Sequence, residues 1–484
     1  MKNLIVLAMS TLPKNITDKS TAICRENNFE IEYTSQLVPI PAMMLHQYPD
    51  DDLDIIILAT DKTTEINKDA SCSAVQFFQD ELKKKYLAQE DRITFYVVDK
   101  LDLMNPIAKI DEVLALLREL SSEKNYSQIW LDTHGGLRNV MQVFSALLSL
   151  ARVYGIKIDK IYDCEYDGNQ SIIREQSESF GIFDYFSSMD DFVKYGDAET
   201  LGDYYKDDQR EEIKKAIAAM KLISSGTEEC DPGKYTHGLT QLRNALGDAE
   251  KADTKFKIFG EYIRSNYGDL LISNDPDPLL IVQRSLDKHL YQQALTFMES
   301  LMGEKFVKSG VLSFDQNGNN ATQARKHDKL EREDIVKYMF DALINTQIFL
   351  FPKSHKTPGL PKEEQQNKDT KEAIDEFVRL KGSFDQFIET GSFALVNSTL
   401  QYNNMKSFTL SEKKKPGDPA SYPYYCDVKV TGDKKKALAY LLLMHKALKS
   451  CRNFFNHANE NRPDMENIKI VLGMYCKLAD VLLS

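Results

Sequence analysis

Residues 129–144 read IWLDTHGGLRNVMQVF, and this stretch decides how the first part of the chain folds. An apolar run is followed by a polar loop with two glycines and then by apolar residues about 3.6 positions apart. We interpret the segment as a strand, a loop and a helix. In open α/β sheets, ligands bind outside the carboxyl ends of strands, where the N-termini of the following helices point.

The same alternation repeats through the preceding and following sequence. Strands separated by amphipathic helices predict a parallel sheet covered on both sides, so we expect an α/β Rossmann-like N-terminal domain over residues 1–180. The apolar runs that we assign to strands are 4–10, 29–35, 54–60, 93–99, 128–133 and 160–166.

The pattern changes near residue 180, where β-like runs nearly vanish. We expect an interdomain hinge at 181–207 and a mainly α-helical C-terminal domain at 208–484. Surface insertions are expected near 308–330 and 391–433, the second with the pattern of a small hairpin. The helical patterns are 208–224, 254–266, 279–307, 331–350, 369–390, 434–459 and 466–483.

Composition narrows the class of protein. The 484 residues are 42% hydrophobic and 28% charged, which is typical of a globular chain with more than one domain. No apolar run reaches the roughly 20 residues of a membrane helix, so we expect no membrane partner. Seven cysteines without a C-x-x-C pair predict a reducing, cytoplasmic location. The net charge of −12 argues against general nucleic-acid coating and against DNA, although a local basic cleft is compatible with it.

The loop after the 128–133 strand carries several groups suited to an anion. Gly135 and Gly136 have no Cβ and let a ligand approach the backbone closely. The N-terminus of the next helix favours phosphate. Thr133 and His134 can donate to oxygens, and Arg138 can form charge-assisted hydrogen bonds. These residues predict a phosphate-containing ligand.

Other interpretations of this loop remain open. It could be a Gly-Gly turn that merely starts a helix, while the oxyanion loop of α/β-hydrolases would need a G-x-S-x-G elbow that the chain lacks. A G-x-G-x-x-G fingerprint and a Walker A loop are absent, so NAD and ATP have no support. Ser10 and Thr11, after the 4–10 run, could lie at the same rim or be plain turn residues.

A second stretch, SCRNFFNHAN at 450–459, has a different character. On a helix with Arg452 at zero, Asn453 and His457 fall at about 100° and about 140°, with the two phenylalanines on the opposite side. No acidic residue occurs from 437 to 459, and His445 joins the same polar arc. The polar face would therefore suit a polyanion, although an ordinary solvated face is the alternative.

These residue types suit metal-independent RNA cleavage, in which a 2′-hydroxyl attacks the adjacent phosphate and the 5′-oxygen leaves. His457 can move a proton, Arg452 can hold the developing charge, and Asn453 can orient either group. Residues about 140° apart on one helix do not converge easily, so we expect a twofold homodimer with the pocket on its axis. The same spacing recurs from Arg284 to His289, where it includes an acid, and we do not expect catalysis there.

Together, DTHGG after a strand and RNFFNH near the C-terminus resemble the CARF–HEPN effector ribonucleases of type III CRISPR systems. The resemblance covers the layout of the whole chain, but only about fifteen residues match motifs. Thr133, His134 and Gly135 fit the CARF pattern, and Arg452, Asn453 and His457 fit the HEPN pattern. The stretch FVKYGDAETL also looks like the boundary segment of that family.

The resemblance implies a cyclic oligoadenylate, tetra-adenylate first and hexa-adenylate second, as the allosteric activator of an antiviral endoribonuclease that cuts single-stranded RNA and requires no cofactor. It places the ring on the loop, with Ser10 and Thr11 nearby. The ring-contacting residues that it implies are Thr133, His134, Gly135, Gly136 and Arg138. Two alternatives stay open: a nucleotide-sensing regulator without nuclease activity, and a toxin-like ribonuclease without ligand control.

Overall fold

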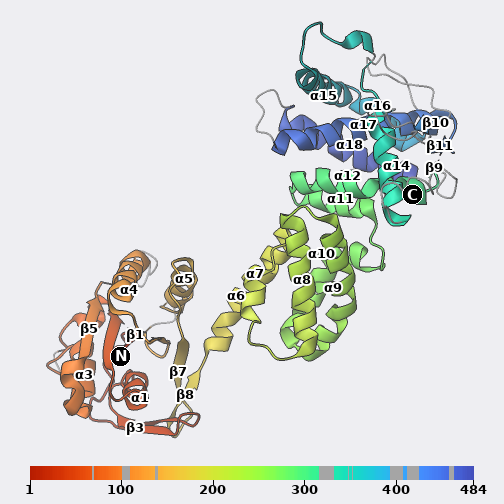
Figure 1. The fold of residues 1–484 in the computed structure, drawn as a ribbon. Coiled ribbons are helices and arrows are strands. Elements are labelled where there is room, and N and C mark those ends of the chain that lie inside the picture. The colour runs from red at the N-terminus through yellow and green to blue at the C-terminus, as the bar shows by residue number, and fades with distance from the viewer. Residues whose placement is uncertain are drawn as a thin grey trace. The chain divides into compact units, whose positions relative to one another are not determined.

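The computed structural model describes residues 1–67, 70–100, 109–136, 140–314, 332–346, 348–351, 353–392, 407–410, 424–456 and 463–484. They form two compact units, Met1–Phe186 and Ser187–Ser484. The boundary lies inside helix α6 (Ser177–Tyr195), within the range predicted for the hinge (Figure 1).

The first unit is built on one eight-stranded sheet with the order β3-β2-β8-β7-β6-β1-β4-β5. The five strands from β7 to β5 in this order pair in parallel. The strands are β1 (Lys2–Ala8), β2 (Ser20–Cys24), β3 (Phe29–Tyr33), β4 (Asp52–Leu58), β5 (Ile93–Val98), β6 (Gln128–Asp132), β7 (Lys160–Tyr166) and β8 (Ser171–Glu175).

Helices cover both faces of this sheet (Figure 1). Successive side chains of a strand point to opposite faces. Ile5 and Leu7 of β1 therefore join the core formed with α1 (Pro39–Gln47) and α3 (Ala74–Lys85). Leu4 and Val6 join the opposite core, formed with α4 (Ile110–Lys124) and α5 (Val140–Val153). The predicted α/β Rossmann-like class is confirmed.

The sheet is mixed, whereas the sequence analysis predicted only parallel strands. β2 and β8 were missed, and the pairs β2–β3 and β7–β8 are antiparallel. The turn between β7 and β8 contains Asp167 and Gly168, and Gly168 has a φ of 104°. An Asp-Gly pair between two β-like runs is a strong hairpin signal, so the sequence did contain this information.

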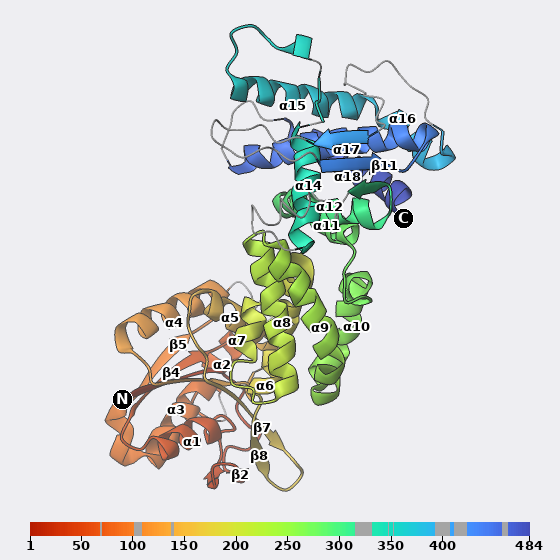
Figure 2. The same ribbon diagram turned by 45° about the vertical axis from the view of Figure 1, so that its right-hand side comes forward.

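The described part of the second unit is mainly helical, as predicted (Figure 2). In their packing, α8 contacts α9, α11 contacts α12, and α17 contacts α12, α14 and α18. The helices are α7 (Glu199–Tyr204), α8 (Glu211–Glu228), α9 (Pro232–Ala252), α10 (Thr254–Leu271), α11 (Pro278–Asp287), α12 (Tyr291–Lys308), α14 (Arg332–Thr346), α15 (Lys362–Arg379), α16 (Lys381–Thr390), α17 (Gly432–Asn456) and α18 (Met465–Leu483).

Two features of this unit differ from the sequence patterns. The helix expected over 279–307 is divided into α11 and α12, because His289 between them has a φ of 61°, outside helical geometry. Helix α9 was not predicted at all, although Asp231 caps its N-terminus by accepting from the Gly233 and Lys234 amides.

The described parts of the two predicted insertions meet in one small sheet. Its order is β10-β11-β9, and both pairs are antiparallel. β9 (Leu312–Phe314) comes from the first insertion, and β10 (Ser407–Leu410) and β11 (Tyr424–Val428) come from the second. The predicted hairpin is present as β10–β11, and β9 extends it from a segment nearly a hundred residues earlier.

Candidate functional site

The loop 133–136 lies at the carboxyl end of β6, next to the end of β1. Leu7 pairs with Asp132 across these parallel strands, which brings the residues after β1 beside the loop. The Gly136 amide donates a hydrogen bond to Oγ of Ser10 at 3.0 Å. Two segments more than 120 positions apart in sequence therefore meet at one rim, as the strand-end argument predicted.

Gly135 is required here by close packing. A Cβ at this position would lie 2.0 Å from the carbonyl oxygen of Ala8 and 2.5 Å from Cδ2 of Leu37. Gly136 has a φ of 86°, a conformation that favours glycine. The two glycines thus let the chain turn tightly against the end of β1.

The polar groups of the loop are partly engaged within the protein. The Thr133 hydroxyl donates to the carbonyl of Tyr162 at 3.0 Å, which leaves only its acceptor capacity for a ligand. The His134 amide donates to Oδ1 of Asp132 at 2.9 Å. The amides of His134 and Gly136 are therefore not free for an anion, because both hydrogen bonds hold the loop itself.

Burial changes the ionisation of the groups at the base of the loop. Asp132 is fully buried, and burial, with a smaller effect from the nearby Asp163 carboxylate, raises its pKa to about 8. Its Oδ2 has no hydrogen-bond partner among the described residues. Burial lowers the pKa of His134, while Asp163, whose Oδ1 lies 3.9 Å from Nδ1, opposes this shift. A hydrogen bond to the backbone of Cys164 also opposes it. We conclude that His134 is neutral at pH 7.

Thr11 is exposed beside this rim, on a cleft of about 30 Å³, which has room for about one water molecule. A nucleotide would therefore contact the outer surface of the loop instead of entering the cleft. The predicted contact of Arg138 lies outside the described residues. The residues that line the cleft are Met9, Ser10, Thr11, Leu12, Pro13, Thr34, Ser35, Gln36, Ala74 and Phe77.

The second candidate region is helix α17, whose polar face differs from the expected solvated face. His445 was placed in the polar arc, but it is fully buried, and its Nδ1 lies 3.0 Å from the hydroxyl of Tyr475. Burial, with Lys449 and Lys446 nearby, lowers its pKa to about 3. His445 is therefore a neutral core residue, and its assignment to the exposed face was wrong.

Neighbouring helices supply the acidic residues that this stretch of sequence lacks. Lys449 lies 3.0 Å from Oδ1 of Asp341 on α14 and 3.2 Å from Oε1 of Glu299 on α12. Nη1 of Arg452 lies 2.5 Å from Oε2 of Glu299. The face is not the uncompensated basic surface that the helical wheel predicted.

Arg452 nevertheless keeps a side chain that is 30% exposed, and its Nε has no hydrogen-bond partner among the described residues. Asn453 lies in α17, but its side chain and the whole of His457 lie outside the described part of the chain. Their predicted convergence with Arg452 stays a prediction.

Arg284 and His289, which repeat the Arg-to-His spacing, make contacts within the fold. The Arg284 guanidinium stacks on the ring of Tyr267, 3.4 Å from its centroid, and donates to the carbonyls of Asn266 and Val193. Nδ1 of His289 lies 2.8 Å from the hydroxyl of Tyr291. These contacts join α11 to neighbouring segments and explain why the two residues are present.

The sequence analysis missed a cleft of about 650 Å³ in the first unit, between α5 and α6. None of the predicted site residues lines it, and its lining residues form no motif that the sequence would reveal. The residues that line it are Ser145, Ala146, Ser149, Gly155, Ile156, Lys157, Ile158, Ile161, Ser177, Phe180, Gly181 and Asp184.

The described residues contain neither a candidate metal site nor a candidate membrane-spanning helix. Among them, no three or more His, Cys, Asp or Glu residues are grouped so that they could hold a metal ion. No helix in this part of the chain is long and apolar enough to cross a bilayer.

Comparison with known proteins adds little to this geometry. No protein-family model and no curated protein matches the chain. The chain is similar to the solved structure of Enterococcus italicus Csm6 bound to cyclic hexa-2′-fluoro-hexa-dAMP, at 7% sequence identity over 100% of each chain and with a TM-score of 0.33. A likeness at this TM-score assigns neither a site nor a reaction.

Proposed function

We propose that the protein is a cyclic-oligoadenylate-activated, metal-independent endoribonuclease of the CARF–HEPN type, which acts as a cytoplasmic homodimer in CRISPR antiviral defence. The loop 133–136 and its neighbours bind the activator, and α17 with the residues after it cleaves single-stranded RNA. The observation that carries the proposal is Arg452, whose side chain is 30% exposed and paired with Glu299, five positions before His457.

The reaction follows from the chemistry of these groups. The RNA 2′-oxygen attacks the adjacent phosphorus, the bond from phosphorus to the 5′-oxygen breaks, and a 2′,3′-cyclic phosphate and a 5′-hydroxyl form. His457 accepts the 2′-hydroxyl proton or donates a proton to the leaving oxygen, and the same residue of a second chain can take the other role. Arg452 stabilises the charge that develops on the phosphate oxygens.

The ligand loop supports recognition of nucleotides more than of free phosphate. The ring of a neutral His134 bonds the Cys164 backbone and keeps one nitrogen for a base or a ribose, and the exposed Thr11 hydroxyl is available at the same rim. Since the local cleft holds about one water molecule, a large ring would spread over the surface, and a second copy of the loop would double its contacts.

The first test is cleavage of labelled single-stranded RNA in EDTA, with and without cyclic tetra- or hexa-adenylate. Cleavage that requires a ring supports the proposal, and cleavage without a ring assigns the toxin-like alternative. Saturable ring binding with no cleavage assigns the nucleotide-sensing regulator instead.

A second test concerns the ligand loop. His134→Ala and Arg138→Ala should each raise the ring concentration that gives half-maximal cleavage, while the maximal rate at saturating ring stays unchanged. An unchanged dose response in both variants would remove this loop from the activator site.

A further inference from the structure

Glu299 on α12 bridges two cations of α17. Its Oε1 lies 3.2 Å from Nζ of Lys449, and its Oε2 lies 2.5 Å from Nη1 of Arg452. The Glu299 side chain is only 14% exposed, so both contacts lie at a largely dry helix interface. One carboxylate thereby fixes two side chains that lie almost one helical turn apart.

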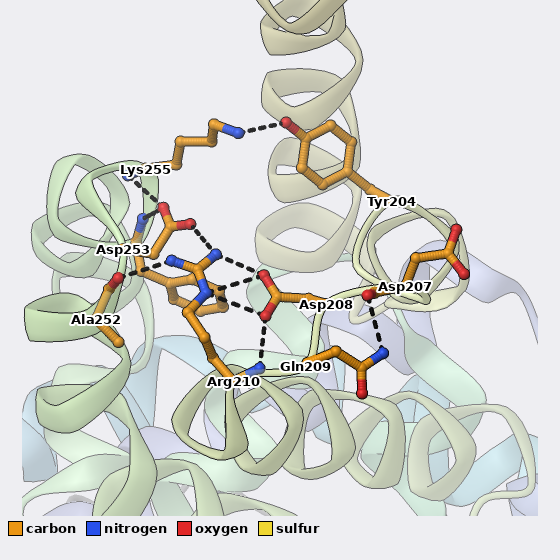
Figure 3. Close-up of polar contacts among 9 residues, drawn as sticks. Tyr204, Asp207, Asp208, Gln209, Arg210, Ala252, Asp253 and Lys255 are labelled. Atoms are coloured by element: carbon orange, nitrogen blue, oxygen red, sulfur yellow. Dashed lines mark hydrogen bonds and ion pairs between the residues drawn. The ribbon is translucent and has the colours of Figure 1, made fainter. Parts of the chain in front are cut away.

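Arg452 differs from other arginines of the second unit in how fully its donors are used. Arg210 donates to both oxygens of Asp208, to Asp253 and to the carbonyl of Ala252, as Figure 3 shows. Arg264 binds both carboxylate oxygens of Glu250, at 2.5 and 2.7 Å. In the described part of the chain, Arg452 makes one ion pair, and its buried Nε has no partner. The contact between Nη1 and Oε2 of Glu299 is an ion pair by distance but lacks hydrogen-bond geometry.

We propose that Glu299 is a positioning residue for the RNA-cleaving site: it orients Arg452 so that the second Nη of the guanidinium faces the scissile phosphate. The inference rests on the proposed ribonuclease function. A carboxylate beside one Nη restricts the side-chain rotamers of Arg452. The other Nη then remains as the donor for a phosphate oxygen, because Nε is buried.

The charged side chains around Arg452 allow Glu299 to orient Arg452 without neutralising the cluster. Lys446, Lys449 and Arg452 stand against Glu299 and Asp341, which leaves one net positive charge when all five side chains are ionised. Glu299 also shares its charge with Lys449, so a phosphate that approaches Arg452 still meets a cationic surface.

The test is Glu299→Gln in the full-length protein, measured as ring-activated RNA cleavage at varied RNA concentrations. Glutamine keeps the shape of the side chain, and Lys449 keeps its contact with Asp341. We expect kcat to fall by about tenfold to a hundredfold, the cost of a misplaced catalytic group, with ring affinity unchanged. Unchanged or increased kcat would overturn the proposal, the latter by showing that Glu299 restrains Arg452 from acting.

Asp341→Asn is the matched control. It removes the other acidic partner of Lys449 and leaves the Glu299–Arg452 contact intact. We expect kcat to change by less than about twofold, because the orientation of Arg452 is maintained. An equal loss in both variants would show that only the charge or stability of the cluster matters, and would overturn a specific role for Glu299.

A double-mutant cycle separates positioning from general stability. Glu299→Gln should reduce kcat much less in an Arg452→Lys background than in the wild type, because the two residues act as one unit. Equal factors in both backgrounds would overturn the inference. Thermal unfolding of the wild type, the two single variants and the double variant tests the contact without any activity measurement. If the changes in unfolding temperature of the single variants add up to that of the double variant, the contact is contradicted. A wild type that cuts no RNA with either ring would refute the proposed function itself, whatever the unfolding data show.

Discussion

The strand-end loop of the first unit and helix α17 of the second are held by partners of different origin. The loop is fixed by groups on neighbouring strands of its own sheet, namely Ser10 after β1 and Tyr162 on β7. The polar side chains of α17 are fixed by Glu299 and Asp341, which lie on helices more than a hundred residues earlier in sequence. A loop at a strand end takes its neighbours from sheet order, whereas a helix face takes them from packing.

The loop and α17 also differ in the charge of their polar side chains. At the loop, burial favours neutral forms, so the base of the loop carries an uncharged Asp132 and an uncharged His134 at pH 7. At α17, ion pairs with Glu299 restrict the orientation of Lys449 and Arg452. The first region suits recognition of a nucleotide, and the second suits stabilisation of charge on a phosphate.

The largest expected effect is at the end of the α17 segment. His457→Ala should reduce ring-dependent RNA cleavage by at least about 10²-fold, because it removes the proton-transfer group, while ring binding stays intact. The control is His237→Ala, an exposed histidine on α9 that contacts Gln241. Cleavage at the wild-type rate by the His457 variant would show that the α17 segment does not carry out the RNA cleavage.

Gly135→Ala should act on the loop alone. Its Cβ would clash with the Ala8 carbonyl and Leu37, so we expect a loss of about 1–3 kcal/mol in unfolding free energy and a more than tenfold weaker ring affinity. Gly247→Ala is the control, since nothing lies within 4 Å of its added Cβ. Calorimetry and ring titration measure both quantities. Ring affinity at the wild-type level would show that the loop does not determine binding.

The buried carboxyl at the base of the loop predicts a dependence on pH. Burial raises the pKa of Asp132 from 3.8 to about 8, so between these values the folded state keeps a proton that the unfolded state has lost. The free energy of unfolding should therefore fall as the pH rises from about 4 to about 8. Asp132→Asn should flatten this slope, as measured by thermal melting across that range. Parallel curves for the two proteins would contradict a protonated Asp132.

The smallest effect is expected from Ser10→Ala. It removes the acceptor of the Gly136 amide, a loss of about 1 kcal/mol, and should raise the half-maximal ring concentration about fivefold. Ser149→Ala, which removes an exposed hydroxyl within α5, serves as the control. Identical dose responses for both variants would show that the Ser10 contact does not support ring binding.

Sequence patterns predicted the strands that carry the loop because each combines an apolar run with a flanking turn, and both signals are local. They missed β2 and β8 because these strands are only five residues long and include polar residues, which weakens the apolar signal. They placed Arg452 on a polar helix face correctly, but they gave His445 the wrong environment. A helical wheel gives the angular position of a side chain without showing what packs against it.

The sequence by itself determined the α/β-then-helical order, the glycine turn after β6, and the spacing of Arg452 and His457, because these depend on chain-local geometry. Only the tertiary structure decided that Ser10 binds the loop, that His445 is buried, and that Glu299 holds Arg452. Those contacts join residues far apart in the chain, and no local periodicity encodes which distant helix will supply the opposing charge.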